Sequence, residues 1–518
     1  MASSSLQRFF DAVATLIGEE NISRTPSHGA LQGPHGQHSY ADPFALHAKH
    51  DPSGAVRPKE VPEVQEILRL ANAHLVHLWT VSRGKNLGYG GAAPVEKGCV
   101  VLDLHRMNRI IEINEESAYA IVEPGVSFFD LYHEIKKRGL NLWPSVPAIG
   151  WGSVLGNTLD RGFGYTPQGE HSQSQCGMEV VLPTGELIRT GMGAMKDSAL
   201  FPLFKGGYGP SVDGLFYQSN LGVVTKIGMH ITPAPEAYAT VEVSVPQESD
   251  LVPLVGILSD LMRRSVILNS PSIANIFRIA LTSQNPEVLA EMKKYMNPGS
   301  CVPYSALEEI RTRQGWGFWK AYFSLYAPVE VLPGLLKTIQ RAFSVIPGAT
   351  VINSDEVGFE EVPHSGIPTL APLESLNSRQ QGSGHVCFSP ILPPSGRELY
   401  DWYLTAKQRT IDAQFDFFAD FHVYPRYVLA IELVVYAPHE EQSMDRLFRH
   451  LLQDAAAQGY TEYRTHVEYM DEVASHFDFN GGALRRFTTL LKDTLDPVGV
   501  LSPGKSGIWN SDRIDPHG

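Results

Sequence analysis

Two glycine-rich segments carry the residue types best suited to binding chemistry. The first, WTVSRGKNLGYGGAAP (79–94), places Gly84, Gly88, Gly90 and Gly91 within eight positions, and the second is GWGSVLGN (150–157). Because glycine has no Cβ, its backbone N–H groups can closely approach an anion such as a dinucleotide pyrophosphate. The alternative is a pair of surface loops. Neither segment has the G-x-G-x-x-G spacing of a Rossmann NAD site, and neither has the G-x-x-x-x-G-K-[ST] spacing of an ATP site.

The elements around these segments alternate between helix and strand. Apolar residues at helical spacing predict a helix within 58–74, and a second helix is expected at 128–138, before Gly139. Strands are expected at 78–82, 99–104 and 118–123, and 178–191 has the pattern of a hairpin with its turn at Thr184 and Gly185.

The prolines at 233 and 235 mark a boundary, after which a second helix and strand pattern begins. It has expected strands at 240–245 and 428–436 and helices at 330–348 and 444–459, and a last helix is expected at 483–495. The sequence therefore predicts an α+β chain with three segments, at 1–235, 236–460 and 461–518.

Composition excludes several functions. The chain has 518 residues, 43% of them hydrophobic, and a net charge of −14, which disfavours a nucleic-acid partner. Its four cysteines are widely separated and form no C-x-x-C pair, and the histidines at 28, 35, 38, 47 and 50 lack metal-ligand spacing, so we expect no metal site. We find neither a signal peptide nor an 18-residue apolar run, and expect a cytoplasmic protein with no membrane association.

Eight blocks carry a family resemblance in order along the chain: SRGKNLGYGGAAP (82–94), VEPGVSFFDLY (122–132), GWGSVLGNTLDRGFGYTPQGEH (150–171), GMEVVLPTGELIRTGMGA (177–194), QSNLGVVTKIG (218–228), GSGHVCFSPI (382–391), EYRTH (462–466) and DPVGVLSPGKSGIW (496–509). The chain resembles the vanillyl-alcohol oxidase/p-cresol methylhydroxylase family of FAD-dependent flavoproteins, with its closest likeness to vanillyl-alcohol oxidase and eugenol oxidase. The resemblance implies a two-domain flavoprotein. Residues 1–235 would belong to the FAD-binding domain, 236–460 would form an α+β substrate-binding cap, and 461–518 would return to the FAD-binding domain and active site.

The resemblance also assigns roles to individual residues. His385 would carry the FAD covalently, and the site that stabilises the substrate's phenolate would use Tyr89, Tyr463 and Arg464, with Tyr165 lining the cavity. The cofactor-binding residues that it implies are Ser82, Arg83, Gly84, Lys85, Asn86, Leu87, Gly88, Tyr89, Pro147, Gly152, Ser153, Gly156, Asn157, Gly222, Val224, His385, Arg464 and Lys505.

The activity implied is oxidation of para-substituted phenols. A hydride would pass from the para Cα to flavin N5, leaving a p-quinone methide, and O₂ would reoxidise the flavin to give H₂O₂. The alternatives are a dehydrogenase that passes electrons to a cytochrome or other carrier, and a flavin- or phenol-binding protein with little turnover. The resemblance further implies a homodimer or larger assembly.

The chain departs from the family's oxidases at one position. Ala148 stands where they carry an aspartate, and an apolar methyl group can neither hydrogen-bond nor accept a proton. Asp160, Glu374 and Glu468 are other carboxylates to consider, and none is assigned its role. The cap segment HVYPRYVLAIE also differs from the family's oxidases, so the accepted para side chain is expected to differ.

Overall fold

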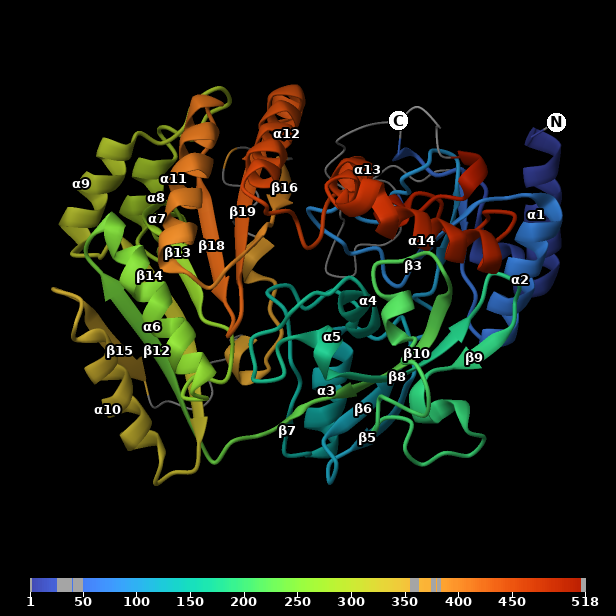
Figure 1. The fold of residues 1–518 in the computed structure, drawn as a ribbon, viewed down its shortest axis with the longest axis horizontal. Coiled ribbons are helices and arrows are strands. Elements are labelled where there is room, and N and C mark those ends of the chain that lie inside the picture. The colour runs from blue at the N-terminus through green and yellow to red at the C-terminus, as the bar shows by residue number, and fades with distance from the viewer. Residues whose placement is uncertain are drawn as a thin grey trace. The chain divides into compact units, whose positions relative to one another are not determined.

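The protein consists of two compact units, each described here by itself. The computed structural model describes residues 2–25, 40, 50–354, 363–373, 379 and 383–513. The first unit comprises residues 1–164, 170–233 and 466–518, and the second comprises 165–169 and 234–465. Both mix helices and sheets (Figure 1), which confirms the expected α+β class. Among the described residues, no helix has the length and apolarity needed to cross a bilayer.

A four-stranded sheet carries the first glycine loop. Its order is β1 (Ile22–Ser23), β2 (Gly54–Val56), β4 (Val100–Asp103) and β3 (Leu78–Val81), with β4 parallel to β2 and β3. Helices α1 (Ala2–Ile17) and α2 (Val61–His74) pack together in the same hydrophobic core. The α2 helix buries its apolar stripe, starts with a capping box at Glu60 and ends at Leu75 in the left-handed conformation.

A five-stranded antiparallel sheet carries the second glycine loop. Its order is β5 (Ile110–Asn114), β6 (Tyr119–Val122), β10 (Val223–His230), β8 (Gln175–Val181) and β9 (Leu187–Arg189). The β8–β9 pair is the expected hairpin. Helices α3 (Phe128–Arg138) and α4 (Val154–Leu159) contribute to its core, the short helix α5 (His171–Ser174) precedes β8, and β7 (Leu142–Trp143) pairs with β11 (Thr232–Pro233).

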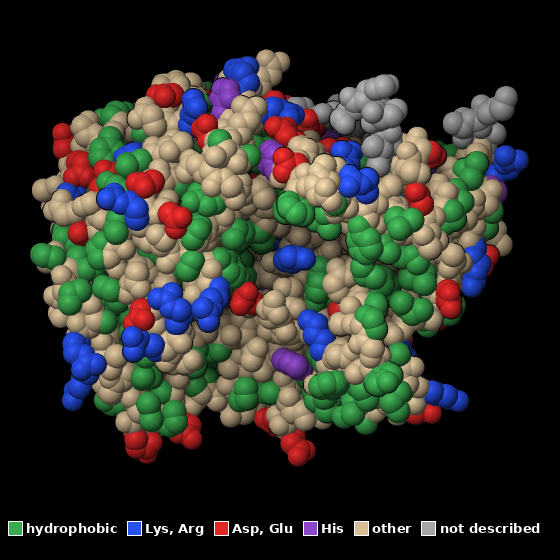
Figure 2. Space-filling model, viewed as in Figure 1, with side chains coloured by type: hydrophobic (Ala, Val, Ile, Leu, Met, Phe, Trp, Pro, Cys, Tyr) green, Lys and Arg blue, Asp and Glu red, His purple; other side chains and the backbone are tan. Residues whose placement is uncertain are grey.

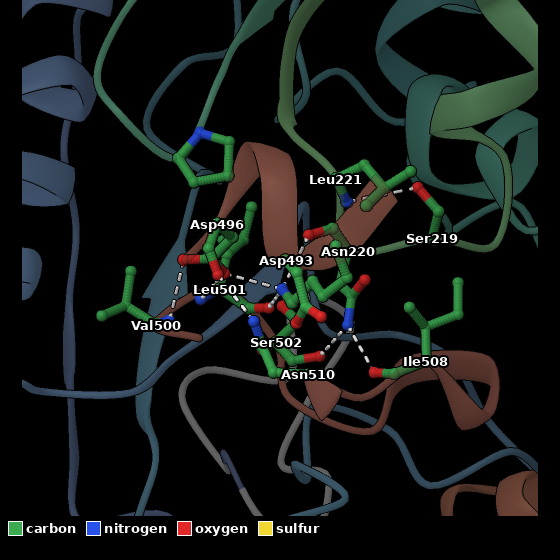
Figure 3. A network of polar contacts seen from close by, with 12 residues as sticks. Ser219, Asn220, Leu221, Asp493, Asp496, Val500, Leu501, Ser502, Ile508 and Asn510 are labelled. Atoms are coloured by element: carbon green, nitrogen blue, oxygen red, sulfur yellow. Dashed lines mark hydrogen bonds and ion pairs between the residues drawn. The ribbon is translucent and has the colours of Figure 1, made fainter. Parts of the chain in front are cut away.

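The C-terminal segment is bound into the first unit by a buried polar network. It contains α13 (Met470–Ser475) and α14 (Phe479–Leu495), and then runs beside β3, where Leu78 N donates to Val500 O at 2.7 Å and Ser502 N donates to Leu78 O at 2.7 Å. In Figure 3, Asn220 faces this segment, and its Nδ2 donates to the carbonyl oxygens of Ser502 at 3.0 Å and Ile508 at 2.9 Å. The segment is therefore an integral part of this unit.

The second unit is built on one antiparallel sheet. The strand order is β15 (Thr350–Ser354), β12 (Ala237–Val245), β14 (Trp319–Ala327), β13 (Ser272–Asn275), β18 (Phe418–Val423), β19 (Val428–Tyr436) and β16 (Gly384–Phe388), and β17 (Ile391–Leu392) also pairs with β19. The unit's α-helices are α6 (Leu251–Arg263), α7 (Ile276–Leu281), α8 (Pro286–Met292), α9 (Tyr304–Gln314), α10 (Leu332–Phe343), α11 (Gly396–Asp412) and α12 (Glu441–Ala457). Helix α10 packs on β12, β14 and β15, α6 on β18, and α12 on β19 (Figure 1).

Candidate functional site

The first glycine loop leaves the end of β3 and needs its glycines. Gly84, Gly88, Gly90 and Gly91 all have positive φ, between 60° and 99°. At Gly90, a Cβ would lie 2.7 Å from a methyl carbon of Val467, so a side chain would also collide with the C-terminal segment. This loop therefore exposes backbone where any other residue would be strained or would clash.

The second glycine loop packs directly on the first. A Cβ on Gly156 would lie 2.1 Å from Ser82 Oγ, so the contact requires glycine. Arg83 joins the loops again, because its Nε donates to Trp151 O at 3.1 Å and its Nη1 donates to Gly125 O at 2.7 Å. Two loops that lie some 70 positions apart in the sequence thus form one surface.

The charges of this surface suit a dinucleotide. Arg83 and Lys85 are both partly buried, and burial lowers the pKa of each. The charge of Arg83 lowers the pKa of Lys85 further, and Asp103 opposes the effect. Clustered cations beside glycine loops fit the anionic pyrophosphate of FAD, and these loops are the residues that would hold it.

The second loop is held by hydroxyl and imidazole contacts. Ser153 caps α4, because its Oγ accepts from Gly156 N at 3.0 Å, and the same Oγ donates to Pro124 O at 2.5 Å. Asn157 Oδ1 lies 2.6 Å from Nδ1 of His171, and Nε2 of His171 lies 2.9 Å from Ser145 Oγ. His171 is the last residue of the block 150–171, but the sequence pattern alone does not mark it as a contact of Asn157.

The remaining expected cofactor residues of the first unit have varied surroundings. Lys505 donates to Asp160 Oδ1 at 2.9 Å, so Asp160 serves as a partner for a cation. Val224 is buried in the hydrophobic core of the five-stranded sheet, and a Cβ on Gly222 would lie 2.6 Å from Val180. Leu87 and Tyr89 are almost fully buried, whereas Asn86, Pro147 and Gly152 are partly exposed.

In the second unit, the segment that carries Tyr463 and Arg464 pairs with the residues that follow the His385 strand. His385 lies on β16 opposite Val435 of β19 and is 4% exposed. The segment that carries Tyr463 pairs with the residues just after β16, because Tyr463 N donates to Ser389 O at 3.2 Å. Glu462 reinforces this pairing, since its Oε1 accepts from Ser389 N at 2.9 Å.

Two buried carboxyl groups, those of Glu462 and Glu432, belong to this part of the second unit. Burial raises the pKa of Glu462 to about 8, and the hydrogen bonds from Thr465 and Ser389 oppose the shift. Burial also raises the pKa of Glu432, on β19, to about 8, and the charge of Glu462 adds to it. Glu432 Oε1 accepts from Trp402 Nε1 at 2.7 Å. Both groups are therefore protonated near neutral pH.

Tyr165 lies in an aromatic cluster that the sequence did not reveal. Its ring stacks on His364 with centroids 5.4 Å apart and meets His422 edge-on at 5.6 Å. His422 Nε2 lies 3.1 Å from Asp420 Oδ1, and Arg278 lies 2.5 Å from the same oxygen. The signal available was the D-x-H spacing on β18, but its partners come from distant segments.

The electrostatics of this cluster favour an anionic Asp420 and neutral side chains at His364 and Tyr165. Burial would raise the pKa of Asp420, but Arg278 and His422 outweigh it and lower the pKa. Burial lowers the pKa of His364 to about 4. Burial, followed by the charge of Asp420, raises the pKa of Tyr165, and Tyr463 adds to this shift. Tyr165 therefore keeps its proton and can donate it in a hydrogen bond.

The candidate residues are thus divided between the units. Tyr89 belongs to the first unit, and Tyr165, His385, Tyr463 and Arg464 belong to the second. Glu468 lies 2.8 Å from His50 in the first unit, and both side chains are 5% exposed, so it is already engaged. Other residues weighed from the sequence lie outside the described residues: Glu374, His28, His35, His38 and His47.

Comparison with known proteins identifies the family. Residues 52–191 match the family model described as an FAD binding domain. The flavoprotein subunit of 4-cresol dehydrogenase (hydroxylating) from Pseudomonas putida is 36% identical over 89% of each chain. Two solved structures have a TM-score of 0.90: 4-ethylphenol oxidase from Gulosibacter chungangensis, with 31% identity over 98% of each chain, and p-cresol methylhydroxylase, with 32% identity over 99% of this chain and 98% of that one. The chain belongs to the vanillyl-alcohol oxidase/p-cresol methylhydroxylase family, and it is an FAD-dependent oxidoreductase of the p-cresol methylhydroxylase type.

Proposed function

We propose that the protein oxidises the para side chain of phenols, with 4-hydroxybenzylic alcohols, 4-allylphenols and 4-alkylphenols as the substrate class. The observation that carries the proposal is the pairing of the Tyr463 segment with the residues following the His385 strand, where Tyr463 N donates to Ser389 O at 3.2 Å. It is supported by the relatives, which are named for 4-cresol, p-cresol and 4-ethylphenol.

Two tyrosines and an arginine are the groups that we propose stabilise a phenolate. A phenol ionises near pH 10 in water, so binding it as an anion requires hydrogen bonds and positive charge. In this proposal the hydroxyl groups of Tyr89 and Tyr463 and the guanidinium of Arg464 supply them, and the neutral Tyr165 lines the cavity. Such donors act more strongly in a site that excludes water than they do in solution.

The cofactor supplies the redox chemistry. When bound, FAD would supply the acceptor for the hydride that leaves the para Cα, and passing two electrons and two protons on to O₂ would give H₂O₂. The phenolate substrate that loses a hydride becomes a neutral p-quinone methide. Water that adds to its Cα donates one proton and leaves an alcohol, whereas loss of a proton from the neighbouring carbon leaves an alkene.

Asp420 and His422 are the proposed acceptors of the proton that this step releases. Their Oδ1 and Nε2 atoms lie 3.1 Å apart, and the imidazole of His422 meets the ring of Tyr165 edge-on. In this proposal the pair takes the role of the aspartate that Ala148 replaces.

The electron acceptor divides two versions of the proposal. The 4-ethylphenol oxidase relative favours O₂, and the relative named as a dehydrogenase flavoprotein subunit favours a protein carrier such as a cytochrome. We propose the oxidase, acting as a homodimer or larger assembly, and retain the dehydrogenase as the second candidate.

Acidic and basic side chains intermingle over the face shown in Figure 2, with no continuous basic surface there for a nucleic acid.

Covalent attachment through His385 is part of the proposal. The buried position of His385 on a sheet strand would hold the cofactor rigidly. Acid-precipitated protein should keep its yellow colour, and precipitated His385→Ala protein should release FAD into the supernatant. A colourless wild-type pellet would contradict the covalent bond.

An anaerobic experiment tests the function. Vanillyl alcohol, eugenol and 4-ethylphenol are each added to the oxygen-free protein, and air is admitted afterwards. Bleaching of the flavin followed by rapid reoxidation with one H₂O₂ per turnover is the expected result. Bleaching with slow reoxidation in air and fast reoxidation by cytochrome c would favour the dehydrogenase, and a flavin that none of the three phenols bleaches would refute both.

A further inference from the structure

His171 occupies a closed polar site between two loops. It is 1% exposed, with Nδ1 2.6 Å from Asn157 Oδ1 and Nε2 2.9 Å from Ser145 Oγ. Phe128 stacks on the imidazole with centroids 5.5 Å apart. A Cβ on Gly164 would lie 2.7 Å from His171 Nε2, so the chain passes directly over the ring. The imidazole therefore has little freedom to turn.

The surroundings of His171 define its protonation. Burial lowers the pKa of His171 to about 3, so the ring is neutral at physiological pH and carries a single N–H. The oxygen of Asn157 can only accept, so the proton lies on Nδ1 and donates to Oδ1. Nε2 then accepts from the hydroxyl of Ser145. Both ring nitrogens have a partner in this arrangement.

The same contacts fix the amide of Asn157. Its Oδ1 is held by His171, and Gly162 lies so close that a Cβ there would be 2.3 Å from Oδ1 and 2.4 Å from Nδ2. The backbone is held as well, because Gly162 N donates to Asn157 O at 2.7 Å. The amide cannot flip without placing its NH₂ group against the protonated nitrogen of His171.

We propose that His171 is a positioning residue for FAD: it holds the Asn157 amide with its oxygen inward, so that the NH₂ group is presented to an acceptor atom of the cofactor. The inference rests on the proposed assignment of Asn157 to the cofactor site. It adds a residue that does not itself contact the cofactor but determines which end of the amide does. Ser145 completes the arrangement, because its hydroxyl lies 2.9 Å from Nε2 of His171 and can donate to it.

Three substitutions separate the two hydrogen bonds of His171. Asparagine places its NH₂ near the position of Nδ1 and keeps the bond to Asn157, whereas glutamine reaches the position of Nε2 and keeps only the contact with Ser145. Phenylalanine keeps the ring volume and the stacking on Phe128, but removes both bonds. All are made in a His385→Ala background, so that FAD binds reversibly, and the dissociation constant is measured by titrating the folded apoprotein with FAD.

We expect H171N to bind FAD within about threefold of the background protein, and H171Q and H171F to bind about tenfold more weakly, the equivalent of one hydrogen bond. The absorbance bands of bound FAD should lose fine structure only in H171Q and H171F. Equal affinity in all three variants would overturn the proposal. If H171F fails to fold, the contrast between H171N and H171Q still decides.

A second cycle shows whether His171 acts through Asn157. In an N157A background, adding H171F should change the dissociation constant by less than about twofold, because the amide to be oriented is gone. An unchanged tenfold loss there would indicate a merely structural role. If N157A binds FAD as tightly as the background protein, Asn157 does not contact the cofactor and the inference fails, while the proposed oxidation of phenols stands.

Discussion

Lys492 and Asp496 form an ion pair of 2.7 Å in which both side chains are fully buried. Lys492 Nζ also donates to the carbonyl oxygens of Leu501 at 2.7 Å and Asn220 at 3.1 Å, so the cation connects α14 to the β3-pairing segment and to the chain before β10. The segment held by this anchor leads to Lys505, whose Nζ donates to Asp160 Oδ1 at 2.9 Å.

Removing the cation of Lys492 should lower the stability of the folded protein. Lys492→Met leaves Asp496 buried without its ion pair, and we expect it to lower the free energy of unfolding by about 3 kcal/mol or more. The matched control is Arg138→Met, which removes an i,i+4 pair with Glu134 at the surface of α3 and should cost about 0.5 kcal/mol. Urea unfolding followed by circular dichroism measures both, and equal losses would contradict the anchoring role.

The local elements could be predicted from the sequence because their signals are local. Apolar spacing in 58–74 gave a helix now observed at Val61–His74, and the Thr184–Gly185 turn gave the β8–β9 hairpin. The helix expected at 483–495 is confirmed as well, since the residues of α14 before 483 include three with non-helical φ and ψ. Each depends on residues within a few positions of one another.

The long-range arrangement could not be predicted in the same way. A lysine in a helical pattern is usually exposed, so nothing in the sequence marks Lys492 as buried. The Tyr165 cluster likewise joins residues from three distant segments, at 165, 364 and 422, and no spacing rule connects them. The roles of His385, Tyr463 and Arg464 came from family resemblance, because their local patterns alone indicate core and strand residues.

Acid should destabilise the protein through His171. Its folded pKa of about 3 lies below the ordinary value of 6.5, so the unfolded chain takes up a proton that the folded chain does not. The stability is fully present above pH 6.5 and is lost as the pH falls toward 3, by about 1.4 kcal/mol per pH unit. The difference in unfolding free energy between wild type and H171N, measured from pH 7.5 to 4.5, should shrink with this slope. Parallel pH profiles would show that the imidazole titrates normally.

Raising the pH above 4.5 should destabilise the protein through the buried pair Glu432 and Glu462. Their folded pKa values of about 8 lie above the ordinary 4.5, so the folded state binds more protons, and stability is lost as the pH rises from 4.5 through 8. Glu462→Gln keeps the acceptor for Ser389 N without the ionisation. Relative to wild type it should gain up to about 1.4 kcal/mol per pH unit over that window. The exposed control Glu287→Gln should show no such trend in chemical denaturation.

The contact between the two glycine loops can be tested by a paired substitution. In Gly156→Ala the new methyl group meets Ser82 Oγ, which should force the loops apart, cost about 1–3 kcal/mol and weaken FAD binding. Adding Ser82→Gly removes the clash and should restore most of the affinity. Gly214→Ala is the control, because a Cβ there meets no atom within 4 Å. FAD binding is measured by flavin fluorescence. If the double variant does not recover it, the contact between the two loops does not determine cofactor binding.

If Arg464 stabilises the phenolate, its removal should slow the chemical step and leave FAD binding unchanged. Arg464→Met should slow anaerobic reduction of the flavin by about 10²–10³-fold, as the removal of one preorganised donor to a developing anion does, while Arg464→Lys should recover part of the rate through its charge. Tyr463→Phe should slow the same reduction by about tenfold. Arg397→Ala, at a side chain 72% exposed on α11, is the control and should reduce at the wild-type rate. Stopped-flow absorbance with vanillyl alcohol measures all four. If Arg464→Met retains FAD and is reduced as fast as wild type, the guanidinium does not stabilise the phenolate.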